Sequence, residues 1–210
     1  MFRKMIASFI VMTILATATL FYLIVSADGD ERTDFDNLDF SFEDKEYYFY
    51  MTDGQIASSI QEARESIRLM DPFQLTPDDP EAGLDEISFV YVETPELTVK
   101  LEARRIFDHF GRTPSVPEIK ESLTDRYLPV KVRFFDNHAY VFDVTVSQEV
   151  GDETREIGIY EANKSSGSLK QILLDMEQAD TDFPLEIRIE DTADPAVYVT
   201  YTLDLQEFVK

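Results

Sequence analysis

The feature that most constrains this chain is an uncharged, apolar run at residues 5–25. A helix rises about 1.5 Å per residue, so a run of this length spans about 30 Å, the thickness of the hydrocarbon core of a bilayer. Arg3 and Lys4 precede the run, and an acidic segment begins at Asp28. Because basic flanks remain in the cytoplasm, the sequence predicts a membrane anchor in residues 1–27 and an extracytoplasmic location for the rest of the chain.

The same run permits a second interpretation, a secretory signal peptide. Val25, Ser26 and Ala27 resemble the small-x-small pattern that precedes a cleavage site. The run is longer than the usual apolar region of about 7–15 residues, however, which favours an uncleaved anchor. Cleavage after Ala27 would instead release a secreted protein. Under both interpretations residues 28–210 lie outside the cytoplasm.

The charge of the exported part limits the kinds of molecule that can bind it. All 42 acidic residues lie after Ala27 with 17 of the basic residues, so residues 28–210 carry a formal net charge of −25. Such a surface repels nucleic-acid phosphates and anionic lipid headgroups. We therefore expect no nucleic-acid partner, and membrane contact only through residues 5–25. The charge is compatible with weak cation binding and with basic partner proteins. The chain has no cysteine, which excludes disulfides and thiolate chemistry.

Two regions follow the predicted anchor. Residues 28–44 contain eight acids and a single basic residue, a composition typical of an extended, solvated tether. Apolar residues within it, such as Phe40 and Phe42, are suited to dock the end of the tether on the domain or on a partner. Residues 45–210 are long enough for one domain with its own core.

The first half of the domain begins with an aromatic run. Residues 46–51 favour a buried strand, with an aromatic binding platform as the alternative. Thr52 and Gln55 then have the spacing of a capping box, which predicts the start of a helix. An apolar stripe continues until Asp71–Pro72 ends the helix. The stripe comprises Ile56, Ile60, Ala63, Ile67 and Met70.

A strand and two helices are expected next. Residues 87–92 are typical of a strand. Thr94 as the N-cap, Pro95 at the first helical position and Gly111 as the stop predict a helix over residues 95–110. A short helix is expected over residues 117–126.

The second half of the domain is dominated by alternating patterns. Residues 130–134 and 140–146 alternate around a turn signal, and residues 157–159 suggest a third strand, so a three-stranded meander is predicted. Ser168 is suited to cap a helix, and residues 185–205 form a final hairpin. The expected fold class is α+β, with one mostly antiparallel sheet and about four helices on one face.

Motifs for common chemistries are missing. The seven glycines are too widely spaced for a phosphate-binding loop, a dinucleotide fingerprint or a nucleophile elbow. Neither His109 nor His138 begins a His-Glu-x-x-His zinc motif, and the acidic segments lack the ligand pattern of an EF-hand. We expect no cofactor and no metal site. A pair of catalytic carboxylates stays open, because acids brought together by folding leave no local signature.

One basic cluster stands out in this acidic domain. On a helix, Lys100 and Arg104 share one face, and Arg105, His109 and Arg112 share another. The cluster is the candidate site for an anionic ligand or an acidic partner segment. The interpretation that the pattern favours, however, is that these cations complement the helix dipole and pair with the surrounding acids.

The first hypothesis for function is a non-catalytic, single-pass membrane protein whose extracytoplasmic domain binds another protein of the cell envelope. Two alternatives come from other classes. One is a secreted or tethered hydrolase that uses a carboxylate pair, and the other is an acidic, cation-binding surface protein adapted to salt.

Overall fold

A computed structural model describes residues 42–81, 84–151, 153–160 and 165–209. The predicted anchor and nearly all of the predicted tether lie outside these ranges. Within them, no helix combines the length and the apolar character needed to cross a membrane.

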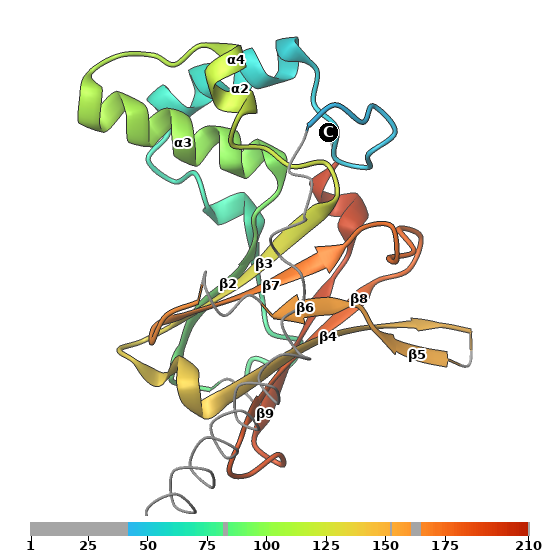
Figure 1. Cartoon of the computed structure of the whole chain (residues 1–210). Coiled ribbons are helices and arrows are strands. Elements are labelled where there is room, and N and C mark those ends of the chain that lie inside the picture. The colour runs from blue at the N-terminus through green and yellow to red at the C-terminus, as the bar shows by residue number, and fades with distance from the viewer. Residues whose placement is uncertain (1–41, 82–83, 152, 161–164, 210) are drawn as a thin grey trace, which may run out of the picture. The chain divides into compact units, whose positions relative to one another are not determined.

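The strands of the described residues form two antiparallel sheets (Figure 1). The first sheet contains, in spatial order, β1 (Gln74–Leu75), β2 (Ile87–Val92), β3 (Tyr127–Phe134), β7 (Leu169–Asp175) and β6 (Gly158–Tyr160). The second contains β5 (Glu153–Glu156), β4 (Phe142–Val150), β8 (Leu185–Asp191) and β9 (Tyr198–Leu203).

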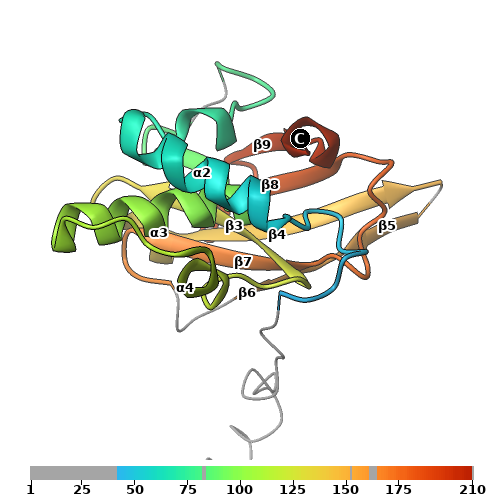
Figure 2. The ribbon, with the colours of Figure 1, turned by 90° about the horizontal axis from the view of Figure 1, so that it is seen from above.

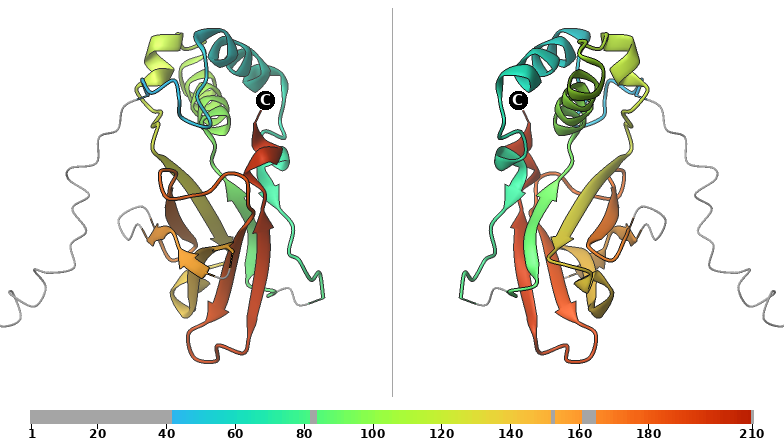
Figure 3. Two further views of the ribbon diagram at one scale, coloured as in Figure 1. Left: turned by 90° about the vertical axis from the view of Figure 1, so that its right-hand side faces the viewer. Right: turned by 90° about the vertical axis from the view of Figure 1, so that its left-hand side faces the viewer.

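Backbone hydrogen bonds tie the two sheets together at two places. Between β5 and β6, the N–H of Ile157 donates to the carbonyl of Val146 across 3.0 Å. Beyond β1, the N–H of Asp78 donates to the carbonyl of Thr200 at 3.0 Å, and its carboxylate accepts from the N–H of Thr202 at 2.9 Å. The sheets therefore share one core, and the side views of Figure 3 show them beneath the helices.

Period-two alternation decides which strand residues reach this core. In β3 the even-numbered residues from Leu128 to Phe134 are buried, whereas Arg133 is exposed. Phe134 stacks on Phe142 of the other sheet, with ring centroids 5.4 Å apart. The same alternation in β8 buries Leu185, Ile187 and Ile189.

Three helices in the described residues are α2 (Asp53–Glu65), α3 (Pro95–Phe110) and α4 (Val116–Lys120). They lie together above the strands in Figures 1 and 3, and Figure 2 shows α2 beside α3. The predicted capping box of Thr52 and Gln55 starts α2, and Thr94 caps α3. Gly111 ends α3 in the left-handed region, at φ +64°, as predicted. Short 3-10 turns are η2 (Asp71–Phe73), η3 (His138–Val141) and η4 (Leu205–Phe208).

The prediction that α2 extends to residue 70 was wrong. The helix ends at Glu65, and Ser66 adopts an extended conformation. The hydroxyl of Ser66 accepts a hydrogen bond from the N–H of Arg68 at 3.1 Å, a local turn that competes with continued helix. Ile67 is consequently 86% exposed. The short helix predicted over residues 117–126 likewise ends early, at Lys120.

The aromatic run at residues 46–51 is not a strand. It forms turns, closed in part by a hydrogen bond from the N–H of Tyr50 to the carbonyl of Tyr47 at 2.8 Å. Tyr47 and Phe49 are nevertheless buried. Strand preference mostly measures how well a side chain packs when buried, and a turn that presses aromatic rings into the core meets the same need.

The predicted meander in the second half was also wrong. β3 and β4 do not pair, because β3 lies between β2 and β7 in one sheet while β4 lies between β5 and β8 in the other. The helix predicted after Ser168 is instead β7, which is buried on both faces from Gln171 to Asp175. Such a strand presents a continuous apolar run that also matches helical spacing.

The α+β class is confirmed in its coarse form. Instead of one sheet and about four helices, the described residues contain two antiparallel sheets and three helices, because the fourth predicted helix is β7. The final hairpin is confirmed, with β8 paired to β9 from Leu185–Leu203 to Glu190–Tyr198.

Candidate functional site

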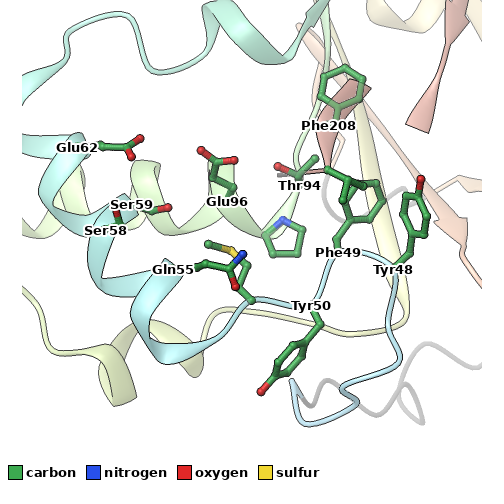
Figure 4. Close-up of a pocket in the computed structure, with 13 residues that line it drawn as sticks. Tyr48, Phe49, Tyr50, Gln55, Ser58, Ser59, Glu62, Thr94, Glu96 and Phe208 are labelled. Carbon is green, nitrogen blue, oxygen red and sulfur yellow. The ribbon is translucent and has the colours of Figure 1, made fainter. Parts of the chain in front are cut away.

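A small pocket lies where the aromatic turn meets α2, the beginning of α3 and η4 (Figure 4). Its volume is about 130 Å³. An engineered cavity of about 150 Å³ holds one benzene molecule, so this pocket has room for about one side chain.

Local structure positions the polar side of the pocket. The capping box sets the phase of α2, so Gln55, Ser59 and Glu62 line the pocket at i, i+4 and i+7 along one face of the helix. From α3, the N-cap residue Thr94 and the first-turn residue Glu96 complete this side.

Aromatic rings form the other side of the pocket. Tyr48 and Phe49 meet edge to face, with ring centroids 5.0 Å apart and planes at 88°. Phe208 of η4 also lines the pocket, and it stacks on Phe73 with centroids 6.3 Å apart. Figure 4 shows the carboxylates of Glu62 and Glu96 on one side of the cavity and the rings of Tyr48 and Phe49 on the other.

A buried lysine holds the two carboxylates. Lys100 Nζ lies 2.6 Å from Glu96 Oε1 and 2.8 Å from Glu62 Oε2, and it sits 5.8 Å from the centre of the Phe73 ring. Burial by itself lowers the pKa of Lys100, but the hydrogen bonds that its ammonium donates to Glu62 and Glu96 outweigh burial and raise the pKa above the ordinary value. The ammonium therefore stays charged, and the three side chains together carry a net charge of −1.

Hydroxyl groups also line the pocket. Ser58 and Ser59 of α2 contribute two of them, and Ser59 is 5% exposed. Thr94 is even more buried, and its hydroxyl accepts from the N–H of Leu97 at 3.3 Å. A serine hydroxyl can both donate and accept, so the serines can hydrogen-bond a ligand in the pocket.

A glycoside hydrolase uses two neighbouring carboxyl groups that flank the scissile bond. Glu62 and Glu96 are neighbouring carboxylates, and both contact the ammonium of Lys100. Among the described residues, no group of three or more histidine, cysteine or acidic side chains is arranged to hold a metal ion.

A second cavity, of about 350 Å³, lies between the beginning of α3, the segment after α4, and the outward-facing residues of β3 and β7. Its charged side chains include Glu93 and Lys131, which form an ion pair with each other.

The predicted basic cluster is divided by the fold. Lys100 is 7% exposed and forms the ion triad at the pocket together with Glu62 and Glu96. Arg104 Nε donates to Asp108 at 2.9 Å, and its guanidinium also reaches the carbonyls of Ala63 and Ser66 at 3.4 Å. The three other members lie exposed toward the end of α3, where Arg105 pairs with Glu102, Arg112 pairs with Glu118, and His109 Nδ1 is 2.9 Å from the carbonyl of Arg105.

Sequence reasoning missed the pocket. The i, i+4, i+7 spacing of Gln55, Ser59 and Glu62 beside an aromatic run was the available signal, as was the i, i+4 pair of Glu96 and Lys100. Neither pattern is specific, because polar helix faces and such pairs are common on surfaces.

No protein-family model, curated protein or solved structure matches this chain. The fold and the pocket alone describe the protein: an α+β domain with a pocket of about 130 Å³.

Proposed function

We propose that this chain is a non-catalytic protein-interaction protein of the cell envelope. Residues 5–25 hold it in the membrane and the domain lies outside the cytoplasm, where it binds another protein. The observation that supports this most directly is the pocket of about 130 Å³ with an aromatic side and a carboxylate side.

The size and composition of the pocket favour a protein partner. Protein interfaces concentrate their binding energy in a few anchor side chains that enter preformed pockets. This pocket accepts about one such side chain, and Tyr48, Phe49 and Phe208 supply the rigid apolar contacts that anchors need. Glu62, whose side chain is 50% exposed, lies at the solvent side and is accessible to an approaching partner.

The pocket also disfavours the hydrolase alternative. A substrate of several sugar rings exceeds the volume of the pocket, and both carboxylates form ion pairs with Lys100. Binding without chemistry is the function that this geometry supports.

Site-specific photocrosslinking in intact cells tests the proposal. A photoreactive phenylalanine derivative at Tyr48 should crosslink the full chain to one discrete partner. The same residue at Tyr140, which is 74% exposed on η3, is the matched control and should give no such product. A third position, His109, tests the basic cluster as the contact surface. A discrete product at His109 alone would move the interface to that cluster, and no product at any position would refute a protein partner.

Topology is tested independently by protease treatment of cells whose outer layers have been removed. The domain should be digested while residues 5–25 stay with the membrane. Full protection of the domain would contradict the proposed orientation, and release of a chain that begins at Asp28 would identify the secreted alternative.

A further inference from the structure

The pocket combines three features that together select a ligand: aromatic faces, excess negative charge and serine hydroxyl groups. The aromatic side consists of Tyr48, Phe49 and Phe208. Aromatic faces attract cations through the ring quadrupole, and this attraction strengthens when the site is shielded from water.

The negative charge reaches both sides of the pocket. Among the described residues no lysine or arginine lines it, and the two negative charges of Glu62 and Glu96 exceed the single positive charge of Lys100 behind them. On the aromatic side, burial and then the nearby carboxylates of Asp204 and Asp182 raise the pKa of Tyr48. A cation that enters therefore meets a negative potential from two directions.

The hydrogen-bonding groups favour a planar donor. The hydroxyl of Ser59 and the carboxylates of Glu62 and Glu96 present several acceptors, and the rings of Tyr48 and Phe49 lie on the other side of the pocket. A guanidinium presents five N–H donors in one plane, stacks on aromatic faces and pairs with carboxylates. An ammonium is compact, strongly hydrated and unable to stack in this way.

We propose that the pocket binds the guanidinium of an arginine side chain on the partner protein, with the plane of the group against the aromatic side and its N–H groups directed at Glu62 and Ser59. This assignment rests on the proposed function and specifies the chemistry of its partner. The exported part carries a net charge of −25, which also favours a basic partner surface.

Methyl NMR of the full chain in detergent micelles tests the assignment. Met51 lines the pocket and is 7% exposed, so its ¹³C-labelled methyl group reports directly on occupancy. Met176 does not line the pocket and is the internal control. The probe is N-acetyl-arginine amide, and its neutral control is N-acetyl-citrulline amide, which has nearly the same shape without the charge. The arginine probe should shift the Met51 signal to saturation and leave the Met176 signal in place, while the citrulline control should shift neither signal.

Two variants localise the effect. Glu62→Gln should weaken binding of the arginine probe about tenfold, because a charge-assisted hydrogen bond becomes a neutral one. Glu186→Gln removes an exposed charge in β8 and should leave binding unchanged. Because Glu62 also forms an ion pair with Lys100, a thermal unfolding curve of each variant checks that the fold is kept. Ser59→Ala is a second pocket variant, and it leaves the ion pairs of Lys100 with Glu62 and Glu96 intact.

The outcomes separate this assignment from the proposed function. Equal shifts from arginine and citrulline probes, stronger binding of N-acetyl-lysine amide, or shifts that do not saturate would each overturn the guanidinium assignment. If Tyr48 still crosslinks to a partner in cells, the protein-binding function would stand even though the guanidinium assignment is wrong. Saturable arginine binding without any crosslink would support the pocket chemistry and refute the protein partner.

Discussion

Replacing Lys100 with methionine tests whether the ion triad stabilises the domain. The substitution keeps an unbranched side chain one atom shorter and removes the ammonium that Glu96 and Glu62 share. The Glu96 side chain is only 11% exposed and is left without this charge partner, whereas the Glu62 side chain is 50% exposed and stays largely solvated. Breaking a buried ion pair costs about 3–5 kcal/mol of stability. Because Glu62 stays solvated and only Glu96 becomes a buried charge without Lys100, we expect a loss near the lower end of this range.

The expected loss of about 3 kcal/mol is large beside a domain stability of about 5–15 kcal/mol. Urea unfolding of the full chain in detergent micelles, followed by far-UV circular dichroism, measures it. The exposed residue Lys45 provides the control, and Lys45→Met should leave the unfolding midpoint unchanged.

A double variant distinguishes a lost partner from a lost contact. Lys100→Met combined with Glu96→Leu removes both buried charges, so most of the stability should return, because apolar replacement of a buried pair is often neutral or stabilising. If the single variant loses less than about 0.5 kcal/mol, or if the double variant is no more stable than the single one, the triad does not have the energetic role assigned to it.

Three further predictions follow from burial and charge. Ile60→Asp should destabilise the domain by several kcal/mol because Ile60 is 5% exposed, whereas Ile67→Asp, at an 86% exposed position, should leave thermal unfolding nearly unchanged; equal effects would contradict the observed end of α2. A hydrogen bond from Arg112 lowers the pKa of Glu118 below 4.5, so its stabilising contribution is present above that pH and is lost as the pH falls through the folded-state pKa. Glu118→Gln preserves the capping-box residue type and should reduce the acid dependence of the unfolding midpoint; an unchanged pH profile would argue against the ion pair. Burial raises the pKa of Tyr91 to about 12, so stability is lost as the pH rises from 10 towards 12, and Tyr91→Phe should lessen that alkaline loss in urea titrations.

The sequence by itself determined the features that depend on neighbouring residues. The capping box of Thr52 and Gln55 and the N-cap and C-cap of α3 rest on contacts within a few residues, so spacing alone located them. The alternation of apolar and polar residues also predicted β8 and β9, because one face of each strand is buried.

Tertiary structure decided the features that depend on what covers each segment. β7 is a strand because β3 and β6 supply hydrogen bonds on both sides, although its apolar spacing also fits a helix. β3 and β4 separate into two sheets because β3 pairs with β2 and β7, whereas β4 pairs with β5 and β8. The pocket also depends on tertiary structure. Tyr48, Glu62, Glu96 and Phe208 come from four segments of the chain, and only packing of the core brings them together. Local propensity is worth less than about 1 kcal/mol per residue, whereas burial of one large apolar side chain is worth about 1.5–3 kcal/mol, so the packing prevails wherever the two conflict.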